Sequence, residues 1–202
     1  SYALLCIAVI AGNCFYISFN QNQKKHITDS DRKSHEYYTQ GTDLGQKGEY
    51  EKSLEFFDKS IELTPNNKRP YMHKGVVLDH LGAYQQAIEC YDQALNIDGN
   101  EYRIYLNKSV TLLHLQQYKE AIECTNKGIA LNPKEPILFN NKGASLDALN
   151  RYTEAVDSYN KAIALKPDYI EPHANKACPL YNLGRYEEAI ETCDKAIALD
   201  PK

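Results

Sequence analysis

Residues 136–169 read PILFNNKGASLDALNRYTEAVDSYNKAIALKPDY, and residues 170–202 repeat this pattern as IEPHANKACPLYNLGRYEEAIETCDKAIALDPK. In both stretches a tyrosine (Tyr152, Tyr186) is followed three residues later by an alanine (Ala155, Ala189), and the stretch closes on an apolar pair and a proline. The tyrosine recurs every 34 residues, at Tyr50, Tyr84, Tyr118, Tyr152 and Tyr186. A period of this length indicates a stacked array of small units instead of one globular core.

Each unit shows helical spacing of apolar and small residues twice, with a short turn such as Leu81-Gly82-Ala83 between the two runs. We therefore expect a helix, a tight turn and a second helix in every unit. In the second copy they fall at about 69–81 and 85–97, and in the other copies at positions shifted by 34 residues. The prolines are expected to end the second helices, and Gly99 to end one in a left-handed conformation.

A small residue recurs inside the first helix of each unit, at Gly41, Gly75, Ser109, Gly143 and Ala177. Glycine inside a helix costs about 1 kcal/mol relative to alanine, so its recurrence needs a packing reason. We expect this position to face the recurrent alanine of the second helix, so that the two helices approach closely.

This combination of a small residue, then glycine-x-tyrosine, then alanine, an aromatic residue, alanine and proline resembles the tetratricopeptide repeat family. The resemblance covers residues 34–202 in five copies, of which the last is one residue short. The tryptophan position of the family departs from the pattern and is held by Tyr37, Tyr71, Tyr105, Phe139 and His173. The resemblance implies an all-α fold, a right-handed superhelical solenoid of antiparallel helix pairs, whose concave groove binds peptides or partner proteins and whose repeats are not catalytic.

The domain organisation follows from the repeat and from the composition before it. We expect repeats at 34–67, 68–101, 102–135, 136–169 and 170–202, and a polar tether at 20–33. Residues 2–19 carry no charge and are long enough to cross a bilayer as an apolar N-terminal helix. We therefore expect residues 1–19 to be a transmembrane anchor, with a cleaved signal segment as the alternative.

The location of the repeats is predicted from charge and cysteine use. Four basic residues follow the apolar run, which favours a single-pass anchor with cytoplasmic repeats, while an exported or periplasmic location is the alternative. Cys90 and Cys124 lie one period apart, too far to form a disulfide, and we expect free thiols.

Several classes of function are disfavoured by the sequence. The repeats carry 19 basic and 25 acidic residues, so we expect no nucleic-acid partner. No phosphate-binding loop, nucleophile elbow or metal-ligand motif is present, and we expect no cofactor, no metal site and no enzymatic activity. His73 and His80 lie about 10 Å apart along a helix, which also argues against a metal site.

The sharpest candidate site is a row of asparagines in the first helices of repeats three to five, Asn107, Asn141 and Asn175. An amide both donates and accepts, so a row that faces the groove can pair with an extended peptide backbone. A similar row of asparagines lines the peptide groove in the repeats of the O-linked N-acetylglucosamine transferases. The resemblance implies the same role for the asparagines here. The other groove residues that we predict are Arg69, His73, His80, Arg103, His114, Asn140 and Tyr181.

A row of lysines directly follows the asparagine position, at Lys74, Lys108, Lys142 and Lys176. The next residue of a helix points about 100° away, so these lysines belong to another face. They are either a basic surface for an acidic partner or long side chains that cover the repeat junctions. The lysine and asparagine of the chaperone-tail clamp found in some relatives are replaced by Tyr38 and Thr42, so we expect no binding of that tail.

The sequence therefore predicts a non-catalytic, membrane-tethered scaffold or adaptor that binds a partner protein or an extended peptide in a concave groove. The alternative is the N-terminal substrate-binding or regulatory arm of a larger, transferase-like enzyme. No polar capping helix follows the last repeat, so its exposed apolar face predicts a continuing chain, a dimer or an adhesive fragment, and self-association through this face is a third hypothesis.

Overall fold

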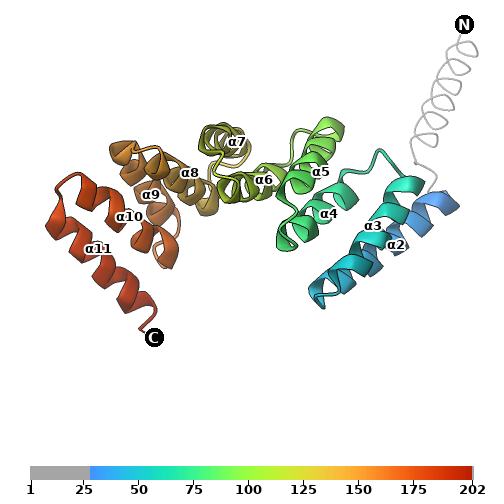
Figure 1. The fold of residues 1–202 in the computed structure, drawn as a ribbon, viewed down its shortest axis with the longest axis horizontal. Coiled ribbons are helices and arrows are strands. Elements are labelled where there is room, and N and C mark those ends of the chain that lie inside the picture. Colours follow the sequence, from blue (N-terminus) through green and yellow to red (C-terminus); the bar gives the residue numbers. More distant parts are fainter. Residues whose placement is uncertain (1–27, 202) are drawn as a thin grey trace, which may run out of the picture.

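The computed structural model describes residues 28–201, and every regular element in that range is a helix. In chain order the helices are α2 (Asp29–Gln46), α3 (Tyr50–Leu63), α4 (Lys68–His80), α5 (Tyr84–Ile97), α6 (Tyr102–His114), α7 (Tyr118–Leu131), α8 (Pro136–Ala148), α9 (Tyr152–Leu165), α10 (Ile170–Asn182) and α11 (Tyr186–Leu199). The two helices predicted for the second repeat are found within one residue of their expected bounds. The predicted all-α solenoid of antiparallel helix pairs is thus confirmed (Figure 1).

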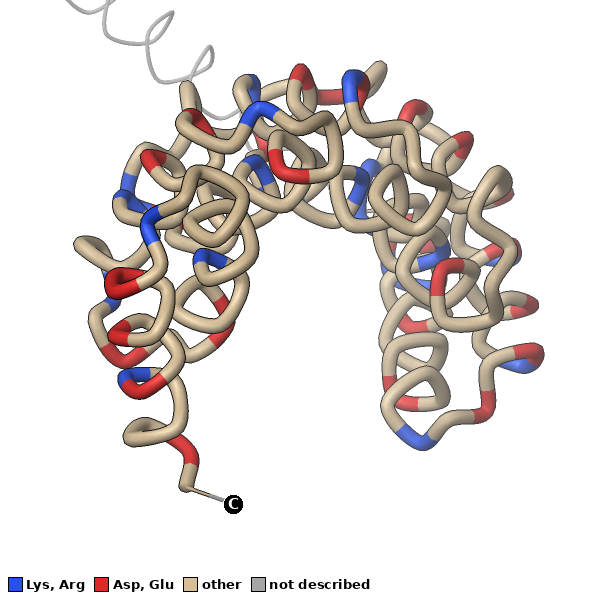
Figure 2. The backbone as a smooth tube through the Cα atoms, turned by 60° about the vertical axis from the view of Figure 1, so that its left-hand side comes forward, with Lys and Arg blue, Asp and Glu red and all other residues tan. Residues whose placement is uncertain are grey.

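The helices form two layers along a curved array. Each first helix (α2, α4, α6, α8, α10) packs against the second helix of its own repeat (α3, α5, α7, α9, α11). First helices of successive repeats also contact one another, whereas among residues 28–201 no two second helices do. The first helices therefore line the inner side of the arch in Figure 2, and the second helices lie on its outer side.

The turn inside each repeat requires one residue with positive φ, and these residues recur every 34 positions. They are Gly48, Gly82, Gln116, Asn150 and Gly184, with φ between 58° and 78°. Glycine suits this left-handed position and asparagine tolerates it. Gly99 is not among the residues with positive φ, and α5 ends on Asp98 in an extended conformation, so the left-handed cap predicted at Gly99 is wrong.

The recurrent glycine of the first helix does not make room for alanine, as the sequence suggested, but for an aromatic ring of the second helix. A Cβ atom at Gly41 would lie 2.8 Å from Phe57, and one at Gly143 would lie 2.6 Å from Tyr159. Gly75 and Tyr91 repeat the arrangement. Repeats three and five have a larger residue in place of glycine, and in both the ring is replaced by a smaller side chain, in the pairs Ser109 with Thr125 and Ala177 with Cys193.

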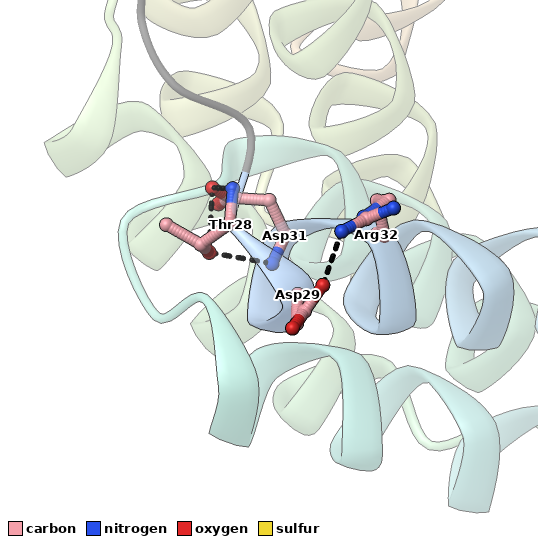
Figure 3. A network of polar contacts seen from close by, with 4 residues as sticks. All are labelled: Thr28, Asp29, Asp31 and Arg32. Atoms are coloured by element: carbon pink, nitrogen blue, oxygen red, sulfur yellow. Dashed lines mark hydrogen bonds and ion pairs between the residues drawn. The ribbon is translucent and has the colours of Figure 1, made fainter.

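The first helix begins earlier than the sequence indicated. Residues 29–33, which we assigned to a polar tether, form the first turn of α2. Figure 3 shows the reason: the Thr28 hydroxyl accepts from the Asp31 amide, and the Asp31 carboxylate accepts from the Thr28 amide at 2.9 Å. This reciprocal capping box satisfies amides that the end of a helix otherwise leaves unpaired. Arg32 also forms an ion pair with Asp29 one turn away.

Pro179 lies inside α10, which continues through it to Asn182. The expected anchor at residues 1–19 and most of the tether lie outside the described residues. Within residues 28–201 no helix combines the length and the apolar character needed to cross a membrane.

Candidate functional site

A pocket on the inner surface lies between α2 and α4, and side chains of α3 also line it. The cavity has a volume of about 430 Å³. Small residues of α2, Gly41, Thr42 and Gly45, leave the space open. Tyr38, Tyr50, Phe57, His73, Val76, Val77 and His80 supply its aromatic, imidazole and aliphatic walls. A pocket of this composition accepts an apolar or aromatic side chain and offers a few polar partners at its edge.

The two histidines of the pocket are held by aromatic neighbours. His73 Nε2 shares a hydrogen bond of 3.1 Å with the Tyr38 hydroxyl, and the two rings meet edge to face. His80 stacks on Tyr50 with ring centroids 5.6 Å apart and an angle of 5° between the planes. Burial, and to a smaller extent the nearby Arg69 cation, lower the pKa of His73. The imidazole of His73 is therefore neutral at physiological pH and offers a neutral polar edge.

A second polar cluster joins α4 to α6 beyond this pocket. The Thr111 hydroxyl donates to the Asp79 carboxylate at 2.6 Å, and His114 Nδ1 lies 3.5 Å from the same carboxylate. His114 also packs against Tyr84, with ring centroids 4.9 Å apart. The predicted groove residue His114 is thus tied to the neighbouring repeat by a carboxylate and an aromatic ring.

The three predicted asparagines do not form a uniform row of open amides. Asn141 is buried, with 6% of its surface exposed, and its amide donates to the Ser109 hydroxyl of the preceding repeat at 3.1 Å. Asn175 is exposed and donates to the side chain of Asn140, which is 8% exposed. Asn107 is half-buried. The amides of Asn140 and Asn141 therefore join first helices to one another, and Asn107 and Asn175 are the accessible members of the set.

The remaining predicted residues are spread along the array. Arg69 is exposed at the start of α4, near Tyr38 and His73. Arg103 lies on the Tyr102 ring, 5.8 Å from its centroid. Tyr181 is 65% exposed and packs edge-on against Tyr186 at the far end. The structure therefore brings Arg69, His73 and His80 together at the front pocket but leaves Arg103 and Tyr181 apart from it.

Sequence reasoning missed Tyr38 and Tyr50 as parts of the pocket. Tyr50 belongs to the recurrent tyrosine series, which indicates the 34-residue period but no binding role. Tyr38 stands out in the sequence only because it replaces a residue of the chaperone-tail clamp. The signal that was available is that a histidine, His80, follows Tyr50 at a spacing close to one repeat, which places the two rings side by side.

The lysines occupy the junctions between repeats and point away from the inner surface toward the preceding second helix. Lys74 contacts Asp58 at 2.5 Å, and Lys108 forms an ion pair with Asp92. Lys142 and Lys176 instead donate to the neutral amides Asn126, at 2.7 Å, and Asn160, at 3.1 Å. All four lysines are half-buried, so their stems cover the junctions, as one of the two interpretations predicted.

Further hollows lie outside the inner surface. A groove of about 520 Å³ runs between α5 and α7 over α6, and Lys108 and Asp92 are in its wall. An apolar pocket of about 650 Å³ lies on α10 and α11 among Ala177, Cys178, Tyr181, Tyr186, Ala189, Ile190 and Cys193. The cysteines at positions 90, 124, 178 and 193 are free. Within residues 28–201 no three histidine, cysteine or acidic side chains are grouped to hold a metal ion.

Both the sequence and the fold are similar to those of known proteins. Sequence models described as tetratricopeptide repeat match residues 38–102, 80–140, 136–169 and 171–202. The chain belongs to the tetratricopeptide repeat family. A curated relative, the uncharacterized protein MJ0572 of Methanocaldococcus jannaschii, is 50% identical over 34 residues, which are 17% of this chain. The match spans 40% of that relative's length.

Solved structures show the same solenoid at low sequence identity. MamA from Desulfovibrio magneticus RS-1 aligns with a TM-score of 0.79 at 22% identity and covers 87% of this chain and 97% of its own. YrrB, described as a tetratricopeptide repeat protein with an unusual peptide-binding site, gives 0.70 at 23% identity, covering 82% and 86%. PilF of Pseudomonas aeruginosa gives 0.76 at 21%, covering 85% and 78%. At these identities the likeness shows the fold alone.

Proposed function

We propose that this chain is a non-catalytic scaffold whose inner surface binds an extended peptide or a segment of a partner protein. The observation that carries the proposal is the pocket between α2 and α4, which presents two aromatic–histidine pairs around an open floor. An apolar side chain of the ligand enters this pocket. The ligand backbone then continues along the first helices toward the accessible amides of Asn107 and Asn175.

The affinity that this surface supplies is moderate. A net hydrogen bond contributes about 0.5–1.5 kcal/mol, and a buried aliphatic or aromatic side chain about 1.5–3 kcal/mol. A single anchor and a few amide contacts are therefore consistent with a transient complex whose Kd is near the micromolar range. The arrangement thus suits an adaptor that exchanges partners.

We further propose that residues 1–19 anchor the scaffold in a membrane, with the repeats on the cytoplasmic side. The proposal rests on the uncharged run and on the basic residues after it. Protease protection of the repeats in sealed vesicles tests it: digestion from the lumenal or exported side only would reverse the orientation, and recovery of the chain free of membrane would contradict the anchor.

The apolar pocket on α10 and α11 supports self-association of the scaffold. Ile190 and Ile197 are each 63% exposed on the last repeat, and burial of such side chains favours association. Light scattering of the wild-type chain and of the variant Ile190→Glu tests it. A mass that does not rise with concentration in the wild type would contradict self-association.

The groove proposal is tested by capture of partners from a membrane extract with the full chain. Thr42→Arg fills the pocket with a long side chain, and Thr42→Val is the matched control that keeps it open. A second variant combines Asn107→Ala with Asn175→Ala and spares Asn141, because removal of a buried amide would also weaken the fold. We expect both test variants to lose partners that the control retains, at equal helicity. Partners that survive in both variants would contradict binding at the inner surface.

A further inference from the structure

The outer surface changes its charge along the array because one residue of each repeat junction changes from aspartate to asparagine. Lys74 and Lys108 are neutralised by Asp58 and Asp92. The equivalent acceptors in the next two junctions are Asn126 and Asn160. Lys142 and Lys176 are therefore bonded but not neutralised by their direct partners.

The surrounding residues increase this difference. In the outer groove at α5–α7, the ionised side chains are Asp92, Glu120 and Glu123 against Lys108 and Lys127, so the groove is negative. One repeat later the equivalent positions hold Glu154 and Asp157 against Lys142, Lys161 and Arg151. Two repeats later they hold Glu188 and Glu191 against Lys176, Lys195 and Arg185. The last two junctions are therefore positive, although the whole chain has a net charge of −4.

The donors at these two junctions are also arranged to receive an anion. Asn126 Oδ1 and Asn160 Oδ1 accept one hydrogen bond each from a lysine, which leaves each amide NH₂ free to donate. Each ammonium group has three donors, of which one is used in this bond. A carboxylate placed beside Lys142 or Lys176 thus meets a cation and an amide donor together, whereas beside Lys74 or Lys108 it meets an aspartate that repels it.

Partial burial of the two lysines raises the free-energy cost of having a neutral side chain, and not an anion, as their direct partner. Lys142 and Lys176 are half-buried, and burial lowers the pKa of both, with Lys161 and Lys195 as the next contributors. A half-buried cation whose direct hydrogen-bond partner is a neutral amide gains more from an incoming carboxylate than a solvated cation does, because screening by water is weaker there.

We propose that the outer surface at the α7–α8–α9 and α9–α10–α11 junctions binds an acidic protein segment, whose carboxylates supply Lys142 and Lys176 with the negative charge that Asp58 and Asp92 supply to Lys74 and Lys108. The surface is separate from the inner pocket and does not depend on it. The scaffold therefore has a second binding face, which can be occupied while the inner surface holds a peptide.

The test measures binding of a fluorescent peptide of alternating glutamate and alanine to the full chain by fluorescence anisotropy, in the same mild detergent throughout. The double variant Asn126→Asp with Asn160→Asp places the anion inside the protein. We expect it to bind the peptide at least about tenfold more weakly, as expected for the loss of a charge-assisted contact. Lys142→Gln with Lys176→Gln is expected to show the same loss. Thr42→Arg is expected to leave this binding unchanged.

Two controls distinguish binding at these junctions from a general effect of the net charge of the chain. Asn66→Asp with Asn100→Asp adds the same two charges at exposed turns and is expected to bind like the wild type. Asp58→Asn with Asp92→Asn opens the front junctions and is expected to bind the peptide more tightly. Equal binding by wild type and the Asn126/Asn160 variant would overturn the proposal, as would an equal loss in the turn control. A wild-type chain that binds an oligonucleotide or inorganic phosphate but not the peptide would also overturn it.

Discussion

Gln116 holds a backbone conformation that glycine holds at three of the five equivalent turns. Its φ is 58°, which for a residue other than glycine or asparagine costs about 1–2 kcal/mol. We therefore expect Gln116→Gly to raise the free energy of unfolding by about 1 kcal/mol, measured by urea denaturation. Asn150→Gly is the matched comparison and should gain less, because asparagine tolerates this conformation. A loss of stability in Gln116→Gly would contradict the assigned strain.

The glycine at position 143 is matched to the aromatic ring that packs against it. A Cβ atom at position 143 would lie 2.6 Å from the ring of Tyr159, which is buried with 1% of its surface exposed. We expect Gly143→Ser to lower the free energy of unfolding by about 1–3 kcal/mol. Adding Tyr159→Thr reproduces the pair found in the third repeat, and the two changes should cost less together than the sum of the single changes. Additive losses in the double-mutant cycle would show that the two positions are not matched.

At the scale of elements, the pocket between α2 and α4 makes stability depend on pH. The folded pKa of His73 lies below its ordinary value of 6.5, so the unfolded chain binds that proton more tightly. Stability is then complete above about pH 7 and decreases as the pH falls through 6.5 toward the folded pKa. We expect His73→Gln to reduce this decrease in denaturation curves taken between about pH 8 and 5. The same pH dependence in variant and wild type would contradict the role of His73.

The helix pairs were predictable because their signals lie within one repeat and occur five times. The start of α2 was missed because it depends on one capping box, Thr28 with Asp31, in a polar stretch without apolar periodicity. The role of glycine was misassigned because the ring that it faces lies 16 residues away in the paired helix, and the spacing favoured alanine equally well.

The candidate site was harder to predict than the fold. A period shows that Asn107, Asn141 and Asn175 are equivalent in sequence, but their burial depends on the neighbours in the adjacent repeat. The Asn141 amide meets the Ser109 hydroxyl of the repeat before it, whereas the repeat before Asn175 has Gly143, without a hydroxyl, at the equivalent position. The lysine row shows the same limit, since its partners change from aspartate to asparagine midway. Periodicity therefore locates a surface, and the contacts between repeats decide which of its groups are free.

At the scale of the whole molecule, each repeat is stabilised by its neighbours, so equivalent residues contribute differently at different places in the array. Ile122 is 9% exposed because the fourth repeat covers it, while Ile190, two repeats later, is 63% exposed. We expect Ile122→Ala to lower the free energy of unfolding by about 2–4 kcal/mol. Ile190→Ala should lower it by about 0.5 kcal/mol or less at dilute protein.

Urea denaturation at two protein concentrations checks both variants. The comparison is informative because the two changes remove the same atoms from the same place in a repeat, so any difference between them reflects only what covers the side chain. A large loss for Ile190→Ala at low concentration would contradict the exposure of the last repeat. A loss that grows only with concentration would instead assign the cover to a second copy of the chain, because mass action then adds the free energy of association to the free energy of folding.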